Sequence, residues 1–211
     1  NENVAVTSTA TELNLLDGKA ATNLALIGKQ GGTNFTSSLL IGHATTGTLN
    51  GANFNTIIGD AAGNEITSGD NNTVVGYNSG TELKSATNNV GVGGWTLSQI
   101  STQANNTAVG YLSQKDATGT GNTSLGYDSL EDVTGNYNIG LGYTAGKNIT
   151  SGAGNVIIGY VNAAAADSTR TLKIAGNDGS TTTTWIEGDS AGTVSANGGH
   201  LTTTGKALVM G

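Results

Sequence analysis

The chain contains no cysteine and no proline, and it is poor in charged and aromatic residues. Its 211 residues include 8 Lys and Arg, 15 Asp and Glu, and only 5% aromatic residues. The absence of cysteine excludes disulfides, thiol catalysis and cysteine-ligated metals. Charged residues make up 11% of the chain, against about 25% in typical soluble proteins. An ordinary globular domain is therefore not expected.

Long apolar runs and basic clusters are also absent. No run of 18 apolar residues occurs, so we expect no membrane insertion. The net charge of -7, without a cluster of Lys or Arg, argues against nucleic-acid binding. The sequence begins with Asn1 and has no charged and apolar leader, which suggests a fragment or a processed product.

Glycine, in contrast, is abundant and regularly spaced. Among the 34 glycines, nine recur along the chain with successive differences in residue number of 14, 17, 17, 17, 17, 16, 16 and 17. We call these the anchor glycines: Gly28, Gly42, Gly59, Gly76, Gly93, Gly110, Gly126, Gly142 and Gly159. Self-similarity at a short fixed period predicts a stack of repeated units.

An aliphatic residue precedes every anchor glycine. This regularity predicts a repeat core made of Ile58, Val75, Val92, Val109, Leu125, Leu141 and Ile158. The residue two positions before the glycine points to the other face of a strand, and it is apolar near the ends of the repeat and small in the middle. Strands with apolar residues on both faces are normally buried on both sides. The second face therefore predicts a partner chain.

The period predicts an all-β fold with three parts. Each repeat, with its period of 16 or 17, can supply strand, turn, strand and turn, with a second apolar site seven positions after the anchor glycine, as at Ile66 and Leu83. Residues 23–163 are expected to form a parallel β-roll or β-helix solenoid of about nine such coils. Residues 1–22 are expected to form a connector with a short helical turn. Residues 164–211 are expected to form a small C-terminal β cap with a hairpin turn across 177–179.

Two stretches of the repeat resemble a known family. NNTAVGYLSQ (105–114) and NTSLGYDSLEDVTGN (122–136) are similar to the head repeats of trimeric autotransporter adhesins and to related repeats in bacteriophage tail fibres. TATELNLLDG (9–18) and LTTTGKALVMG (201–211) look like segments of tail-fibre proteins from marine and cyanobacterial phages. The resemblance covers about two-thirds of the chain. It implies an intertwined or side-by-side homotrimer in a virion tail, outside the cell, in contact with other tail proteins. The family often carries a self-cleaving C-terminal chaperone, and adhesin heads use shorter repeats than this chain.

Tyrosine and asparagine also keep to the period. Five of the six tyrosines directly follow an anchor glycine, and we interpret them as an aromatic ladder rather than as sugar platforms: Tyr77, Tyr111, Tyr127, Tyr143 and Tyr160. An Asn stands four positions before each anchor glycine from Gly59 onward. We expect these amides to bond the turn backbone and the next Asn along the stack, rather than to carry glycans.

The residues that could carry chemistry are scattered. Hydrolysis of a glycan needs two carboxylates across one bond, and the adjacent pair Glu131 and Asp132 does not predict that arrangement. His43 and His200 stand alone, without a second metal ligand nearby in sequence. We therefore expect no catalytic residues, no metal and no cofactor, and hence no enzyme.

The sequence favours a structural fibre segment of a phage tail or similar virion appendage. Its partner would be a host-surface glycan or protein, and Trp185, Asp178 and the threonines of 181–184 are the candidate glycan contacts. A bacterial trimeric surface adhesin and a glycan-degrading tailspike are the alternatives. An ice-binding solenoid is less favoured because the threonines do not form a regular Thr-x-Thr array.

Overall fold

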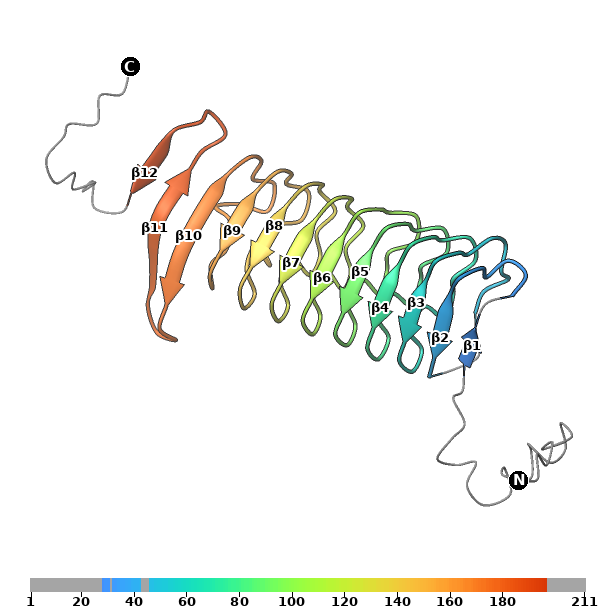
Figure 1. The fold of residues 1–211 in the computed structure, drawn as a ribbon. Helices are drawn as coiled ribbons and strands as arrows, with labels where there is room; N and C mark the ends of the chain where they lie inside the picture. The colour runs from blue at the N-terminus through green and yellow to red at the C-terminus, as the bar shows by residue number, and fades with distance from the viewer. Residues whose placement is uncertain (1–27, 31, 43–45, 197–211) are drawn as a thin grey trace, which may run out of the picture.

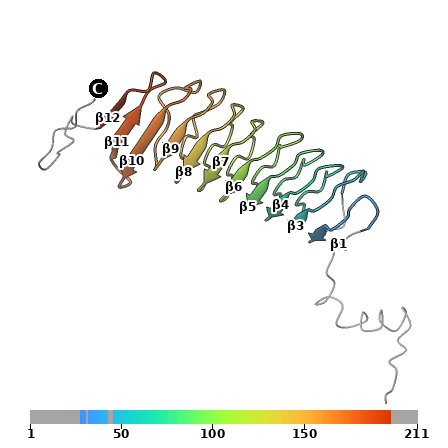
Figure 2. The same ribbon diagram turned by 45° about the horizontal axis from the view of Figure 1, so that its top comes forward.

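The computed structural model describes residues 28–30, 32–42 and 46–196, which form a gently curved rod of stacked coils (Figures 1 and 2). These residues contain strands and turns but no helix, and so no helix that could cross a membrane. The twelve strands form one sheet in sequence order. They are β1 (Gly28–Gln30), β2 (Leu39–Ile41), β3 (Thr56–Ile58), β4 (Thr73–Val75), β5 (Val90–Val92), β6 (Thr107–Val109), β7 (Thr123–Leu125), β8 (Ile139–Leu141), β9 (Val156–Ile158), β10 (Leu172–Asn177), β11 (Thr182–Gly188) and β12 (Val194–Ala196).

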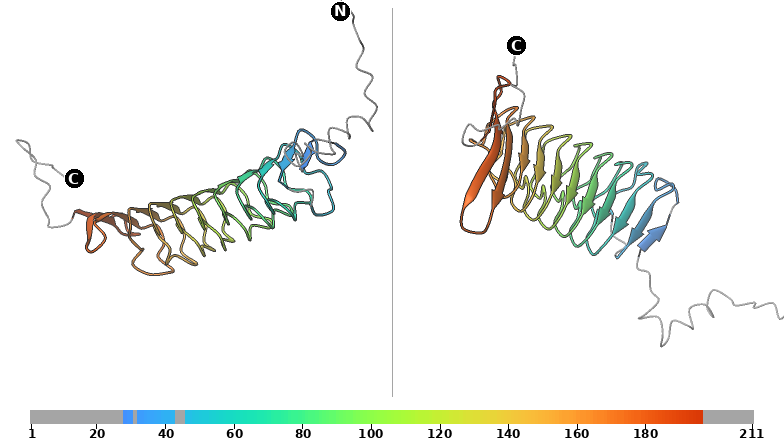
Figure 3. Two further views of the ribbon diagram at one scale, coloured as in Figure 1. Left: turned by 90° about the horizontal axis from the view of Figure 1, so that it is seen from below. Right: turned by 60° about the vertical axis from the view of Figure 1, so that its left-hand side comes forward.

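Each coil contributes one short strand to this sheet. From β2 to β9 every strand pairs in parallel with the next, so that Val109 lies opposite Val92 on one side and Leu125 on the other. The sheet runs along one side of the rod and the turns along the other (Figure 3). The predicted all-β solenoid is present, and hydrogen bonds between neighbouring coils join positions 16 or 17 apart in sequence.

Two features of the predicted repeat are wrong. Gly28 does not anchor a coil, because β1 runs antiparallel to β2 and Gly28 lies opposite Ile41. The interval from Gly28 to Gly42 is also the shortest of the series. The predicted second strand is absent from the described coils, where only a single parallel bridge joins Thr87 and Ala104. The predicted connector of residues 1–22, with its short helical turn, lies outside the described residues.

The core is built from the middle residue of each strand. Ile57, for example, is fully buried, and the same position is buried in every strand from β2 to β9. The residue before the anchor glycine lies on the outer face instead, where Leu125 is 54% exposed. The assignment of Ile58, Val75, Val92, Val109, Leu125, Leu141 and Ile158 to the core is therefore wrong within one chain. Side chains of a strand alternate between faces, and these short strands point only their middle residue inward.

In several coils a turn residue six positions after the strand centre completes the interior. A large strand residue is matched by a glycine in the turn: a Cβ at Gly63 would lie 2.9 Å from Cδ1 of Ile57. In the coil of β5 the strand centre is the glycine and the turn residue is large: a Cβ at Gly91 would lie 3.2 Å from Cδ1 of the buried Leu97. The two positions therefore share one volume. The apolar residue seven positions after the anchor, such as Ile66, is buried as well, but in a turn.

At the anchor glycines the backbones of successive coils approach each other closely. Gly76 has φ of 136°, and a Cβ there would lie 2.5 Å from the carbonyl oxygen of Gly93. Both the left-handed backbone and this short approach exclude a side chain. The spacing of glycine in the sequence is thus the spacing of backbone contacts in the rod.

The asparagine column is fully buried and forms the hydrogen-bonded ladder that the sequence predicts. The side-chain oxygen of Asn72 accepts from the backbone N–H and the Nδ2 of Asn89, both at 3.1 Å. The Nδ2 of Asn72 donates to the carbonyl of Ala86 at 2.8 Å. This pattern satisfies buried backbone groups from coil to coil, which is why the position does not vary.

Candidate functional site

The outer face of the sheet is uncharged and largely apolar along the whole solenoid. From β2 to β9 it carries two columns of residues, the first and the last of each strand. Four of the sixteen residues are threonines and the other twelve are Val, Ile or Leu. None is buried in the chain, and Val90, Val92, Leu125 and Ile139 are exposed. We call these two columns the outer face.

The outer face continues into the C-terminal strands, although the interior does not. Ile174 lies beside Ile158 in register, and Ile186 pairs with Ile174 across the antiparallel β10 and β11. The position that would point into a coil is instead occupied by Lys173, whose Nζ lies 3.1 Å from Oε1 of Glu187. In β10 and β11 the outer side therefore carries the isoleucines, and the inner side carries an ion pair.

The aromatic rings follow one edge of the outer face. Tyr111 and Tyr127 stack with centroids 5.9 Å apart, and Tyr127 and Tyr143 stack at 5.2 Å. Tyr143 meets Tyr160 edge-on at 5.0 Å, and Tyr77 meets Trp95 edge-on at 5.7 Å. Stacked faces cover one another, so these rings present edges and hydroxyls rather than platforms along most of the row.

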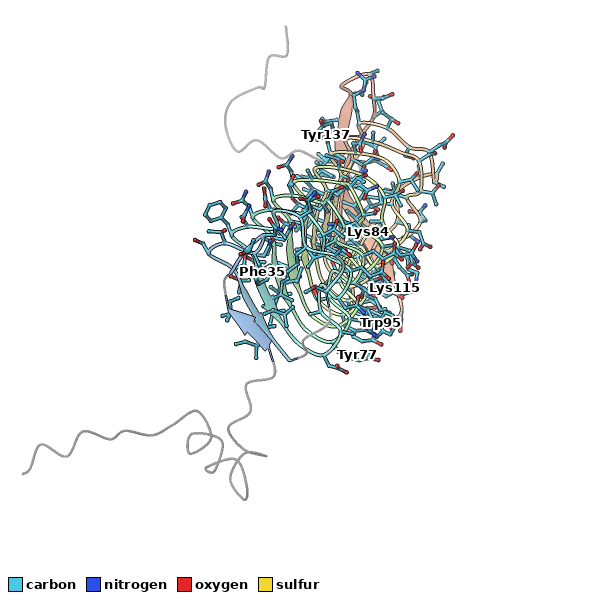
Figure 4. The ribbon with its side chains drawn as sticks, turned by 90° about the vertical axis from the view of Figure 1, so that its right-hand side faces the viewer. Phe35, Tyr77, Lys84, Trp95, Lys115 and Tyr137 are labelled. Carbon is cyan, nitrogen blue, oxygen red and sulfur yellow. The ribbon has the colours of Figure 1, made fainter. Side chains whose placement is uncertain are left out.

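Two lysines of the coils lie away from the sheet. Lys84 and Lys115 lie on the side opposite the strands, while Tyr77 and Trp95 lie at one corner and the exposed Tyr137 at the other (Figure 4). Lys84 pairs with Glu65 at 3.3 Å, which raises the pKa of its ammonium. The cross-section thus has one uncharged face and one charged flank.

An acidic cluster lies on that flank. Carboxylate oxygens of Asp116, Glu131 and Asp132 lie within 4.8 Å of one another. Lys115 lies 2.9 Å from Asp116, and Lys147 contacts both Glu131, at 2.8 Å, and the buried Asp128. Burial raises the pKa of Glu131, while hydrogen bonds donated to Asp128 and Glu131 raise the pKa of Lys147. Lysine ammonium groups pair with two of the three clustered carboxylates, Asp116 and Glu131, so the cluster does not resemble an open metal site or a free acid and base pair.

The hairpin turn between β10 and β11 brings the predicted glycan contacts together. Trp185 and Asp178 line one shallow hollow of about 480 Å³ with Gly176, Asn177, Thr181 and Thr183. Oδ1 of Asp178 accepts the backbone N–H groups of Ser180, at 2.9 Å, and Thr181, at 2.8 Å, which lowers the pKa of this carboxyl. Asp178 therefore shapes the turn and remains ionised.

The structure adds two features that the sequence did not indicate. The register of β10 and β11 shifts between Ile174 and Ala175, leaving Trp185 as an unpaired bulge residue. A second hollow of about 500 Å³ beside the same turn is lined by Tyr160, Asn177 and Thr182. A bulge leaves no clear mark in one sequence, whereas the Asn-Asp-Gly turn signal did locate the hairpin. His43 and His200 lie outside the described residues.

Comparison of the chain with protein-family models, with curated proteins and with solved structures finds no match. The surfaces of the rod are therefore the basis on which a function can be inferred.

Proposed function

We propose that this chain is a segment of a homotrimeric fibre, a structural rod of a phage tail or similar virion appendage that contributes to attachment at a host surface. The observation that carries the proposal is the uncharged outer face, which continues from β2 through the isoleucines of β10 and β11. Large exposed apolar surfaces in soluble proteins mark sites of association.

The outer face alone would supply most of the area of a stable interface. The strands from β2 to β11, spaced about 4.8 Å apart, and a width of about 13 Å from the first strand residue to the aromatic row give on the order of 600 Å² per chain. Stable complexes bury about 800 Å² per partner, with apolar and charge-depleted centres. Flanking turns would supply the remainder.

The periodicity of the outer face favours a second copy of this chain as its partner. Side chains recur at the strand spacing along the whole rod, and a surface with the same pitch can interlock with them at every coil. Another copy of this chain necessarily has the same strand spacing. Parallel copies arranged around one axis form an assembly with closed cyclic symmetry. The number three comes from the resemblance to trimeric adhesin heads and tail fibres.

Sedimentation and native mass spectrometry test the assembly. The chain should behave as three copies, and Leu125→Glu on the outer face should yield monomers or unfolded chains. Ser151→Glu, at an exposed turn position, is the matched control and should remain trimeric. A folded monomer of the unaltered chain at micromolar concentration would contradict the proposal.

The virion assignment needs a separate experiment. Antibodies raised against the chain should label tail appendages of the source particle in electron micrographs. Labelling of a bacterial outer surface would instead support the adhesin alternative. Release of oligosaccharides from host polysaccharide, abolished by a carboxylate-to-amide change, would support the tailspike alternative.

A further inference from the structure

The turn between β10 and β11 extends past the flank of the rod (Figure 1). The reason is strand length: β10 and β11 have 6 and 7 residues, whereas the solenoid strands have 3. We propose that this turn binds an extended oligosaccharide, with Trp185 and Tyr160 as the two aromatic contacts on its two sides. This inference rests on the proposed function only in taking a host-surface glycan as the ligand. It does not depend on whether the chain forms a trimer.

Trp185 is held as a platform by two local features. As the bulge residue it leaves the alternation of β11, and bulges commonly re-aim a side chain at a functional site. Its ring lies against Gly176, where a Cβ would be only 2.4 Å from Cζ2 of the indole. Because Gly176 has no side chain, the indole of Trp185 can pack directly against its backbone. Trp185 nevertheless remains 55% exposed. A flat exposed indole suits the apolar face of a sugar ring.

Polar groups beside the Trp185 ring can still form hydrogen bonds to a ligand. Oδ1 of Asp178 is used by the turn, but no described residue donates to its Oδ2. The hydroxyls of Thr181 and Thr183 line the same hollow and likewise have no hydrogen bond to a described residue. An ionised carboxylate and two hydroxyls beside an aromatic ring can accept and donate to the hydroxyl groups of a saccharide.

The second hollow extends the site across the turn. It is lined by Tyr160, the last ring of the ladder, whose partner Tyr143 meets it edge-on at 87° rather than face to face. Asn177 lines both hollows, and its Nδ2 donates to Thr182 Oγ1 at 2.6 Å. Two rings on either side of one polar turn fit a ligand longer than a single sugar.

Fluorescence can report on Trp185 alone. The chain has two tryptophans, and Trp95→Phe removes the other while keeping a ring beside Tyr77. We would titrate this variant, as the assembled protein, with maltohexaose, mannohexaose and pooled oligosaccharides from bacterial O-antigens. At least one probe should give a saturable blue shift and at least twofold less quenching by acrylamide.

Binding variants then assign the contacts. In calorimetry with the responding probe, Trp185→Ala and Thr183→Val should each weaken binding at least fivefold, and Tyr160→Ala should weaken binding of the hexasaccharide more than that of its disaccharide. Tyr137→Ala changes an exposed ring at the opposite corner and should bind normally.

Two results would overturn the proposal. The first is that none of the probes alters the emission or the quenching of Trp185. The second is that Trp185 is shielded from acrylamide before any sugar is added and that Trp185→Ala dissociates the assembly, which would make the residue an interchain contact. Sedimentation of the same samples reports the trimer independently, so the two proposals fail separately.

Discussion

The backbone N–H of Asn106 donates a 2.9 Å hydrogen bond to Oδ1 of Asn89, which lies one coil earlier. Asn106 in turn accepts from the N–H of Asn122 at 2.9 Å, and its Nδ2 donates to the carbonyl of Gly119 at 3.0 Å. Each amide therefore joins its own coil to both neighbours. The buried ladder makes the stability of one coil depend on the next.

Asn106→Ala should destabilise the rod by about 3 kcal/mol, because it leaves the buried N–H of Asn122 and the carbonyl of Gly119 without partners. Chemical denaturation followed by circular dichroism measures the change. Asn105→Gly is the control, since Asn105 is exposed and its φ of 63° suits glycine. Equal stability of the Asn106 variant and the unaltered chain would contradict the role of the ladder.

Gly110→Ala should be more damaging than an alanine at another left-handed glycine. A Cβ at Gly110 would lie 2.4 Å from the carbonyl oxygen of Gly126, with φ at 121°. Gly192 has φ of 88°, and a Cβ there would meet nothing within 4 Å. Backbone strain alone costs about 1 to 3 kcal/mol. Thermal unfolding should therefore show a loss well above that range for Gly110→Ala and within it for Gly192→Ala.

Stability should fall as pH rises above about 4.5 because of Glu131. Burial raises its pKa above the ordinary 4.5, so the folded chain binds this proton more tightly than the unfolded chain. Between the ordinary and the raised pKa the folded state holds more protons, and linkage then makes stability decrease with increasing pH. The charged groups around Glu131 are Asp116, Asp128, Asp132, Lys115 and Lys147.

Glu131→Gln should remove that decrease, and melting temperatures measured from pH 4 to pH 7 would show it. Glu65→Gln, on an exposed carboxylate paired with Lys84, is the control and should keep the slope. Below about pH 3.9, the ordinary pKa of Asp, stability should instead fall as the pH is lowered. The reason is that backbone hydrogen bonds lower the pKa values of Asp178 and Asp189 in the folded chain, so the stability that these carboxylates contribute is lost as they are protonated. An unchanged slope in Glu131→Gln would exclude Glu131 as its source.

Two adjacent isoleucines separate the core of the chain from its assembly surface. Ile57 is fully buried within a coil, and Ile58 lies on the outer face. Ile57→Ala should cost about 2 to 5 kcal/mol at any protein concentration. Ile58→Ala should act mainly by weakening association, so its effect on melting should shrink at high protein concentration. Melting curves over a hundredfold range of concentration distinguish the two variants.

The sequence predicted the period, the anchor glycines from Gly42 onward and the asparagine ladder because each has a single physical cause. Backbone approach admits only glycine, and a buried corner needs an amide. The inward face was assigned wrongly because both faces of the strands are apolar. Ile57 and Ile58 are the same residue type, so residue type does not reveal which of them points into the coil. The face that includes Gly91 and Gly140 was expected to contact a partner chain, whereas it lies inside the coils. The bulge at Trp185 depends on pairing with β10, which local sequence does not specify.

The shared volume inside several coils was nevertheless visible in the sequence as a pair of positions six apart. Large strand residues accompany glycine in Ile57 and Gly63 and in Val74 and Gly80, and the order is reversed in Gly91 and Leu97. Leu97 keeps a φ of 51°, which a leucine rarely adopts. Filling of this volume therefore outweighs the backbone cost.

A double-mutant cycle tests that compensation. Gly91→Val alone should overpack the coil and cost about 1 to 3 kcal/mol. Leu97→Gly alone should leave a cavity and cost about 3 kcal/mol after relief of its left-handed backbone. The double variant carries the residue types of Val74 and Gly80, although a Cβ at position 91 would still lie 2.9 Å from Oγ1 of Thr96 and 3.0 Å from Oγ of Ser79. Its loss should be smaller than the sum of the single losses by about 2 kcal/mol, measured by denaturant unfolding. Additive losses would mean that the two positions do not share one space.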